Sequence, residues 1–355
     1  MTETRTVLAR RQGAIARLTV NRPEALNALD LPMIRAMTTA LDEWETDPAV
    51  TAVVLDGAGD RAFCAGGDIG VVHASAVGDP AVALTLWREE YRLDARLARY
   101  PKPVVALMDG ITMGGGIGIG AHAAVRVVTE RSVLAMPEVA IGLAPDVGGA
   151  LLLAHAPGEL GTHLALTAGR VRPADAVHCG LADHHVPADR LPALVDDLAA
   201  GAPPETTTKK YAEDPGPAPL AAARCWIDHA YRDAATVEDV LYRLDAIGEP
   251  VTREAVAAIT AAAPTALKVT LRAVRNARAM TSIEACLRQD FRLCGRFLAH
   301  PDLAEGIRAA ILDKDRAPRW RPGTLAEVDD ADVAAFFAPI PDELDLPEPG
   351  HLLHP

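Results

Sequence analysis

Residues 102–120 read KPVVALMDGITMGGGIGIG, an apolar run that ends in Asp-Gly and continues into a glycine-rich loop. The same order occurs once before, where TAVVLDG (51–57) leads into GAGDRAFCAGGDIG (57–70). Short apolar runs bounded by turn residues are typical of buried strands. Residues 80–99, between the two runs, favour a helix. Strands that alternate with helices predict an α/β fold with crossover connections.

The pattern continues on both sides of these runs. Residues 14–20 (AIARLTV) begin with period-two alternation and end at Asn-Arg-Pro, which predicts a strand and a turn. Residues 31–44 repeat apolar side chains at helical spacing after Asp30, a suitable N-cap, and residues 123–130 (AAVRVVTE) predict another strand. On pattern alone, a doubly wound sheet is the alternative arrangement of these elements.

The amino-acid composition of the chain changes near residue 200. The segment 201–220 (GAPPETTTKKYAEDPGPAPL) reads as a loop or linker, an alanine-rich helical stretch follows it, and an acidic, proline-rich stretch ends the chain. We therefore expect an α/β core with the functional site at 1–200, a helical region at 201–320 and a partly irregular tail at 321–355.

Composition narrows the class of protein. Of 355 residues, 50% are hydrophobic and 23% are charged, which suits a globular enzyme, and the net charge of −13 argues against non-specific nucleic-acid binding. The five cysteines form no CxxC pair, which indicates reduced thiols rather than a disulfide framework or a zinc site. The N-terminus lacks the apolar core of a signal peptide, and no apolar run reaches about 18 residues. We expect a cytoplasmic protein without a membrane segment.

Residues 136–149 (MPEVAIGLAPDVGG) contain Glu138 and Asp146 as their only ionisable groups. Proline and glycine in this stretch argue against one continuous helix, so the segment can fold back and bring the two acids into one pocket. The alternative is structural, with Glu138 in a first helical turn after Pro137 and Asp146 as a helix cap.

The glycine-rich loops also admit more than one interpretation. Glycine is usual in tight turns, and the loops do not form a clean dinucleotide or phosphate motif. Glycine also lets a ligand approach the main chain, so each loop can offer one backbone N–H to the same oxygen. Two such donors would form an oxyanion hole, which stabilises charge that develops on a carbonyl oxygen.

Four motifs in this order resemble the enoyl-CoA hydratase/isomerase (crotonase) superfamily, and two later segments are similar to its 3-hydroxyisobutyryl-CoA hydrolase branch. The four are NRPEALNAL (21–29), FCAGGDI (63–69), KPVVALMDGITMGGG (102–116) and MPEVAIGLAPDVGG (136–149), and the later two are TALKVTLRAV (265–274) and DLAEGIRAAILDKDRAPRW (302–320). The resemblance covers about residues 5–325. It implies an α/β spiral of ββα turns with a helical C-terminal region.

The resemblance assigns roles to the glycine loops and to one acid. It implies that a thioester carbonyl lies between the backbone N–H groups of Gly67 and Gly115, with Asp68 beside the first of them in the substrate site. Glu90 matches a residue that binds substrate in the hydrolases. Its alternative role is an ordinary charged position on a solvated helix face.

One departure from the family pattern decides the reaction class. Hydratases place a second glutamate where this chain has Gly118, and glycine can neither position nor deprotonate water. Glu138 matches the catalytic glutamate, and Asp146 matches an acid typical of the hydrolases. Glu138 is then a nucleophile that forms a mixed anhydride or a general base on water. Asp146 binds the substrate hydroxyl, orients Glu138 or shares a proton with it, and two close carboxylates would raise one pKa.

Other reactive residues carry weaker signals. His122 follows a glycine loop, but no GxSxG motif accompanies it, and Cys64 reads as a buried, inert thiol. We expect no metal and no cofactor, since CoA belongs to the substrate. Basic residues of the C-terminal region are candidates for the patch that CoA phosphates require, among them Lys268, Arg272, Lys314 and Arg316.

The expected function is hydrolysis of a 3-hydroxyacyl-CoA, with 3-hydroxyisobutyryl-CoA in valine breakdown as the substrate. One alternative is an enoyl-CoA hydratase or isomerase that uses Glu138 alone, and another is a CoA-binding protein without turnover. The expected partner is an acyl-CoA. Superfamily members are commonly trimers or dimers of trimers, so a homo-oligomer is a further expectation of the resemblance.

Overall fold

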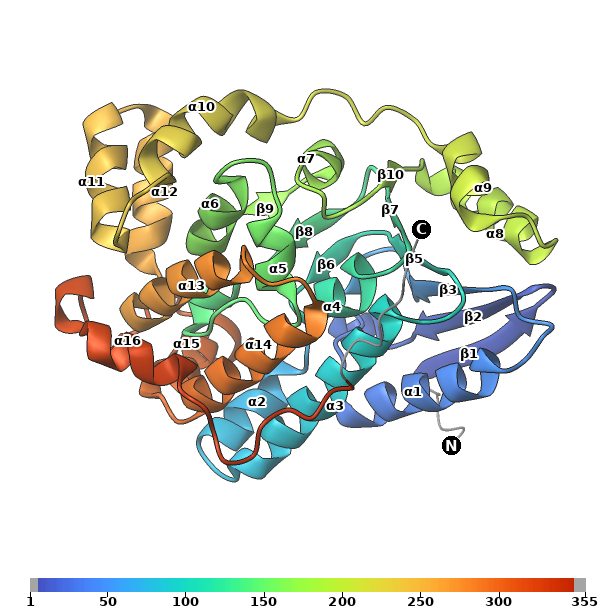
Figure 1. The fold of residues 1–355 in the computed structure, drawn as a ribbon, viewed down its shortest axis with the longest axis horizontal. Helices are drawn as coiled ribbons and strands as arrows, with labels where there is room; N and C mark the ends of the chain where they lie inside the picture. Colours follow the sequence, from blue (N-terminus) through green and yellow to red (C-terminus); the bar gives the residue numbers. More distant parts are fainter. Residues whose placement is uncertain (1–5, 348–355) are drawn as a thin grey trace. The chain divides into compact units, whose positions relative to one another are not determined.

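A computed structural model describes residues 6–347 (Figure 1). These residues divide into two compact units. The first unit consists of residues 6–68, Glu89–Ala135 and Arg170–Ala221, and the second of Ile69–Arg88, Met136–Gly169 and 222–347. Both units are therefore assembled from separate stretches of the chain. The division predicted at 1–200, 201–320 and 321–355 stays a prediction, and residues 348–355 of that tail lie outside the described part.

The first unit contains two sheets. One has the order β1-β2-β3-β5-β7-β10, with β1 (Val7–Gln12), β2 (Ile15–Val20), β3 (Ala52–Gly57), β5 (Val104–Met108), β7 (Val125–Val128) and β10 (His184–His185). The other has the order β4-β6-β8-β9, with β4 (Ala62–Cys64), β6 (Ile111–Met113), β8 (Val133–Ala135) and β9 (Arg170–Val171). Pairing is parallel except for β1 with β2 and β8 with β9.

Successive strands alternate between the two sheets. β3, β5 and β7 each enter the larger sheet, and the strand that follows each of them, β4, β6 or β8, enters the smaller one. This alternation is the spiral of ββα turns that the resemblance implies, and it replaces the single doubly wound sheet that was the alternative. The strands predicted at 14–20, 51–57, 102–110 and 123–130 are confirmed by β2, β3, β5 and β7.

Apolar side chains explain why these segments form buried strands. Val54 of β3, Val105 of β5 and Val127 of β7 are fully buried in one core cluster, and helix α8 (Leu191–Ala199) adds Leu194 and Leu198 to it. Parallel strands covered on both faces read as continuous apolar runs, which is the pattern of 51–57 and 102–110. The core therefore lies under the strands that lead into the glycine loops.

Helices complete the first unit. The helix predicted after Asp30 is α1 (Leu31–Glu45), and Asp30 caps it, since its Oδ1 accepts the Met33 N–H at 2.9 Å. The helix predicted around 80–99 is α3 (Pro80–Ala98), of which the part from Glu89 on belongs to the first unit. Segment 201–220 holds α9 (Pro204–Tyr211), which begins at a proline in the first helical position, and residues 201–203 and 212–218 form the irregular parts of the expected linker. Shorter helices are η1 (Pro23–Ala25), α4 (Gly115–Ala121), α7 (Pro173–His178) and η3 (Ala188–Arg190).

Within the described residues, the regular elements of the second unit are helices. They are α2 (Ile69–Ala76), η2 (Glu138–Ile141), α5 (Gly149–Ala154), α6 (Leu160–Thr167), α10 (Pro219–Tyr231), α11 (Val237–Ile247), α12 (Pro250–Ala261), α13 (Pro264–Ala277), α14 (Ile283–Leu298), α15 (Pro301–Ile307), the π-helical turn η4 (Arg308–Leu312), η5 (Leu325–Glu327) and α16 (Asp330–Phe337). Helix α13 packs against α5 and α6. Its Leu267, Leu271 and Val274, at helical spacing, are buried. Within residues 6–347, no single helix has the length and apolar composition of a membrane span, and only the pair α12 with α13, bent by 112°, reaches them together.

Candidate active site

The loop after β4 is fixed by backbone hydrogen bonds to the motif at 21–29. The Leu29 N–H donates to the Gly66 carbonyl, and the Asp68 N–H donates to the Leu29 carbonyl, both at 2.8 Å. Gly66 has a φ of 112°, a conformation that favours glycine. These bonds leave the intervening Gly67 N–H out of the ladder, and no backbone acceptor for it exists among the described residues.

The second glycine loop brings Gly115 beside Gly67. Gly115 is the first residue of α4, where backbone N–H groups have no partner within the helix, and among residues 6–347 its own N–H donates to no backbone carbonyl. A Cβ atom built on Gly115 would lie 3.2 Å from the Gly67 nitrogen and 2.3 Å from Glu90 Oε1. The two glycines predicted as amide donors therefore lie together in the first unit, with no room for a side chain at 115.

Glu90 of α3 lies against this glycine pair. It is 2% exposed, which excludes the interpretation as a solvated helix face. Its Oε2 lies 4.0 Å from a Cβ atom built on Gly67, so the carboxylate is within reach of a ligand bound at either amide. The neighbouring Cys64 thiol is fully buried, and burial, with smaller contributions from nearby carboxylates, raises its pKa to about 12. An inert thiol, as predicted, fits this environment.

Asp68 has a partner of its own. Arg22 in the motif at 21–29 donates to Asp68 Oδ2 at 3.1 Å and lies 3.3 Å from Asp30 Oδ2. The Asp68 side chain is 28% exposed. This ion pair fastens the end of the Gly66–Gly67 loop to the first motif, while the expected contact of Asp68 with substrate stays a prediction.

The acid pair belongs to the second unit, and its segment folds back as predicted. Glu138 begins the short helix η2, which ends at Gly142 in a left-handed turn, and a new helix, α5, begins at Gly149. Glu138 is 5% and Asp146 7% exposed. Glu138 lies in the first helical turn after Pro137, as the structural alternative has it. The N-cap of α5 is Gly148 without a side-chain hydrogen bond, so Asp146 is not the helix cap that the same alternative requires.

The electrostatics of Glu138 suit acid–base or nucleophilic chemistry. Burial raises the pKa of Glu138 well above its usual value, and the nearby charges of Asp146 and Asp290 raise it further. Its Oε2 is buried and accepts no hydrogen bond from the described residues. The expected like-charge effect of Asp146 is therefore present, although burial is the larger cause.

Asp290 is a third buried carboxylate that the sequence analysis did not single out. It lies on α14, its Oδ2 accepts the Gly148 N–H at 2.9 Å, and its charge acts on both Asp146 and Glu138. Two thiols of the same helix join the cluster, Cys286 at 3.7 Å from Asp290 Oδ2 and Cys294 at 3.7 Å from Asp146 Oδ2. The sequence feature that could have identified Asp290 is the i, i+4, i+8 spacing of Cys286, Asp290 and Cys294. This spacing places an acid on a helix face that is otherwise apolar.

The turn that carries Asp146 is strained. Val147 has a φ of 51° and Gly148 a φ of 74°, so a β-branched residue occupies the left-handed region. Such conformations cost on the order of 1–3 kcal/mol and persist where the surroundings hold them. Here the Gly149 N–H donates to the Asp146 carbonyl at 2.6 Å and closes the turn, and Asp290 accepts the preceding amide, the Gly148 N–H, at 2.9 Å.

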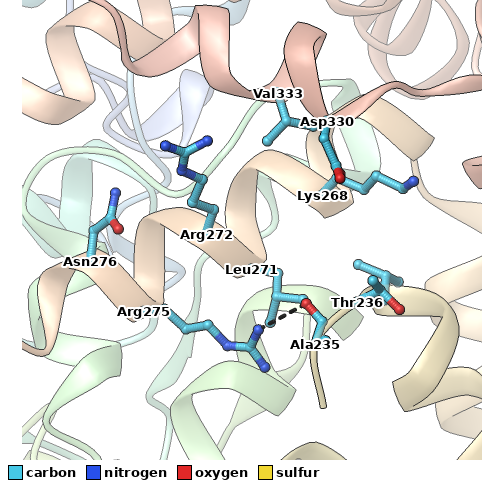
Figure 2. Close-up of a pocket in the computed structure, with 10 residues that line it drawn as sticks. Ala235, Thr236, Lys268, Leu271, Arg272, Arg275, Asn276, Asp330 and Val333 are labelled. Atoms are coloured by element: carbon cyan, nitrogen blue, oxygen red, sulfur yellow. Dashed lines mark hydrogen bonds between the residues drawn. The ribbon is translucent and has the colours of Figure 1, made fainter. Parts of the chain in front are cut away.

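The basic candidates for CoA phosphates do not gather in one place. Lys268 and Arg272 line a groove of about 490 Å³ formed by α11, α13 and α16 (Figure 2). Lys314 and Arg316 lie exposed in the segment after η4. The groove cations already have partners. Lys268 Nζ contacts Glu238 Oε1 at 2.9 Å, and the Arg272 guanidinium stacks 4.6 Å from the Phe337 ring centroid. Figure 2 also shows Arg275, which donates to the Ala235 carbonyl at 3.2 Å.

The structure describes the surroundings of His122 and of the side chains that could bind a metal ion, and the expectation of no metal stays a prediction. His122 follows the last residue of α4, and its backbone forms the cap of that helix. Among residues 6–347, no group of three or more His, Cys, Asp or Glu side chains has an arrangement that would hold a metal ion. The expectation of no cofactor stays a prediction.

Known proteins of similar sequence match nearly the whole chain. A model of the enoyl-CoA hydratase/isomerase family matches residues 15–337. Mitochondrial 3-hydroxyisobutyryl-CoA hydrolase from Rattus norvegicus is 39% identical, with 95% of this chain and 89% of the relative covered. The enzyme of that name from Homo sapiens is 37% identical, with 93% and 88% covered.

Solved structures match the fold. A carnitinyl-CoA dehydratase from Mycobacterium thermoresistibile superposes with a TM-score of 0.92 at 46% identity and covers 96% of this chain and 99% of its own. An enoyl-CoA hydratase from Rhodobacter sphaeroides 2.4.1 gives a TM-score of 0.90 at 42% identity, with 96% and 100% covered. These matches confirm the predicted fold class, and the chain belongs to the enoyl-CoA hydratase/isomerase family.

Proposed function

We propose that this protein hydrolyses a 3-hydroxyacyl-CoA thioester, with 3-hydroxyisobutyryl-CoA as its substrate, to give the free hydroxy acid and CoA. Enzymes of this family act on acyl-CoA substrates. The observation that carries the choice of reaction is the buried pair Glu138 and Asp146, at the positions of the acids that the resemblance assigns to hydrolases. The curated relatives named above, at 37–39% identity, carry the name of this activity.

The backbone N–H groups of Gly67 and Gly115 are proposed to bind the thioester oxygen. Neither N–H donates to a backbone carbonyl in residues 6–347, and a Cβ atom built on Gly115 would lie 3.2 Å from the Gly67 nitrogen. Donors held in advance stabilise the negative charge that forms on the oxygen during attack, and losing one typically costs about 100- to 1000-fold in rate. Glu90, buried beside them, is proposed to contact the bound substrate.

Glu138 is proposed to attack the thioester carbon. A new bond forms between its carboxylate oxygen and the acyl carbon, the C–S bond breaks, and the CoA thiolate leaves and takes up a proton. Water then hydrolyses the mixed anhydride, which releases the hydroxy acid and regenerates Glu138. Asp146, whose charge raises the pKa of Glu138, is proposed to share a proton with it through these steps.

Hydration is the second candidate, because the two proteins of known structure named above are called a dehydratase and a hydratase. Gly118, buried in α4, occupies the position where the resemblance places the second hydratase acid. A glycine offers no carboxylate to water. We therefore expect hydration to be absent or very slow.

One assay separates these functions. The protein is incubated with 3-hydroxyisobutyryl-CoA and, separately, with crotonyl-CoA, while free thiol and enoyl absorbance are followed. Thiol release without loss of the enoyl group supports hydrolysis. The reverse result would establish hydration, and no change with either substrate would leave a CoA-binding protein without turnover.

Isotope labelling tests the nucleophilic step. Under single turnover in ¹⁸O water, attack of water on the protein side of the anhydride labels the Glu138 carboxylate, which mass spectrometry detects after digestion. General-base catalysis labels only the hydroxy acid. Because attack on the substrate side also leaves the peptide light, a light peptide is followed by hydroxylamine trapping, and failure of both experiments excludes the anhydride.

The cellular setting rests on the sequence and on the names of relatives. A role in valine catabolism follows from the proposed substrate. The cytoplasmic location, the absence of nucleic-acid and membrane partners and the homo-oligomer stay predictions. The curated hydrolases named above are mitochondrial by name.

A further inference from the structure

Asp290 connects the helix α14 to the turn that carries Asp146. It is fully buried, and its Oδ2 accepts the Gly148 N–H at 2.9 Å. In the described part of the chain no lysine, arginine or histidine pairs with it. Its polar neighbours there are the Gly148 amide and the Cys286 thiol, and the charge of Asp146 also acts on it. Burial of a carboxylate in such surroundings costs free energy. An apolar side chain would fill the same space without that cost, so packing alone does not explain an aspartate here.

The hydrogen bond from the Gly148 N–H to Asp290 lies next to Asp146, where it affects the direction of the Asp146 side chain. Val147 and Gly148 both have a positive φ, so the chain reverses immediately after Asp146. The Gly148 N–H belongs to the peptide that joins these two residues. An acceptor for that N–H fixes the orientation of the peptide plane and thereby stabilises the unfavourable Val147 conformation.

We propose that Asp290 is a positioning residue for the hydrolytic reaction, which holds the left-handed turn at Val147–Gly148 and so directs the Asp146 carboxylate toward its working position. The inference rests on the proposed function. Cys294 contacts Asp146 from the same helix at 3.7 Å, so α14 holds both the turn and the side chain that the turn presents. The charges of Asp146 and Asp290 both act on Glu138, which places the three carboxylates in one electrostatic cluster.

A pair of substitutions separates positioning from simple structural support. In Asp290→Asn the amide oxygen still accepts the Gly148 N–H, whereas in Asp290→Ala no acceptor remains. We expect Asp290→Ala to lower kcat by about 10- to 100-fold, the scale of a misplaced catalytic group, with KM nearly unchanged. We expect Asp290→Asn to recover kcat to within about threefold of the wild-type protein, because the hydrogen bond is retained.

Asp228 supplies the matched control. Its Oδ1 accepts the Glu159 N–H at 2.8 Å, so it makes the same kind of carboxylate-to-amide bond in the second unit outside the acid cluster. Asp228→Ala should lower the unfolding temperature and leave kcat per folded protein unchanged. Circular dichroism and thermal unfolding of each variant give the folded fraction by which kcat is normalised.

The outcomes distinguish the inference from the function beneath it. If the wild-type protein releases no thiol from 3-hydroxyisobutyryl-CoA, the proposed function fails, and the inference fails with it. If the wild-type protein is active, an unchanged normalised kcat in Asp290→Ala overturns the inference alone. Equal losses of kcat in the Ala and Asn variants, or equal losses in Asp290→Ala and Asp228→Ala, would overturn it as well.

Discussion

Glu138 and Asp146 illustrate how much of a residue's chemistry comes from its surroundings. In the sequence they are two acids in an apolar stretch, compatible with a capped helix. In the structure both are buried, neither caps a helix through its side chain, and the pKa of Glu138 is raised mainly by burial. Burial therefore favours the proposed chemical role over a purely structural one, and the residue types alone do not determine burial.

Substitution of either acid should therefore remove most of the activity. We expect Glu138→Gln and Asp146→Asn each to lower kcat by at least about 100-fold, the lower range for an acid–base group, while binding of CoA is retained. A thiol-release assay measures the loss of kcat, and calorimetric titration with CoA measures the binding. Glu205→Gln, which changes an exposed carboxylate paired with Lys209, is the control. Near-normal turnover in Glu138→Gln would contradict the proposed chemistry.

The raised pKa of Glu138 also predicts a pH-dependent cost in stability. The folded protein holds the Glu138 proton above pH 4.5, the usual value at which the unfolded chain releases it. Folded protein thus binds more protons, and its stability falls as pH rises from that value toward the raised pKa. Below the usual value both states are protonated and the cost vanishes. Glu138→Gln should gain in unfolding temperature relative to wild type as pH rises, measured by thermal scans from about pH 4 to pH 8. A difference that does not change with pH would contradict this.

At the scale of elements, the glycine loops show what sequence can and cannot predict. The strands at 51–57 and 102–110 were predictable because parallel buried strands are continuous apolar runs. That each run ends in a glycine loop was also visible. The meeting of Gly67 and Gly115 was not, because it depends on the strand register and on the bond from Leu29 to the first loop. Asp290 was missed for a related reason, since its partner amide lies 142 positions away in the sequence.

The closeness of these loops predicts the effect of a single methyl group. A Cβ at Gly115 would lie 2.3 Å from Glu90 Oε1 and 3.2 Å from the Gly67 nitrogen. Gly115→Ala should therefore displace Glu90 and obstruct the Gly67 N–H, lowering kcat by about 100-fold, comparable to losing one oxyanion donor. Thiol-release kinetics measure the loss.

Gly295→Ala on α14 is the matched control for this substitution. Its added Cβ would meet only Leu84 Cδ2, at 3.6 Å, an ordinary contact. We expect unchanged kcat and a stability gain of up to about 1 kcal/mol, because alanine is the better helix former. Equal kcat in both variants would show that the space at Gly115 is not used.

At the scale of the whole molecule, residues that are adjacent in the sequence belong to different units at several points of the chain. Gly67 and Asp68 close one stretch of the first unit, and the next residue, Ile69, belongs to the second. Likewise Ala135 ends a stretch of the first unit, and Met136, close to Glu138, begins one of the second. The change in composition near residue 200 was visible in the sequence, but the earlier boundaries between the two units were not. Motifs that look adjacent therefore fold within different units, which local patterns cannot reveal.

The net charge of the whole chain sets the last prediction. At −13 the protein repels a polyanionic CoA thioester at long range, and this repulsion is strongest when salt is low. Raising salt from about 10 mM to about 150 mM shortens the screening length from about 30 Å to about 8 Å. We therefore expect kcat/KM for the CoA thioester to rise over this range. The matching N-acetylcysteamine thioester has no phosphates and should show a flat profile. Rising salt that lowers kcat/KM for the CoA thioester alone would instead mean that a local basic patch outweighs the net charge, and Arg272→Ala would then test whether the groove on α13 is that patch.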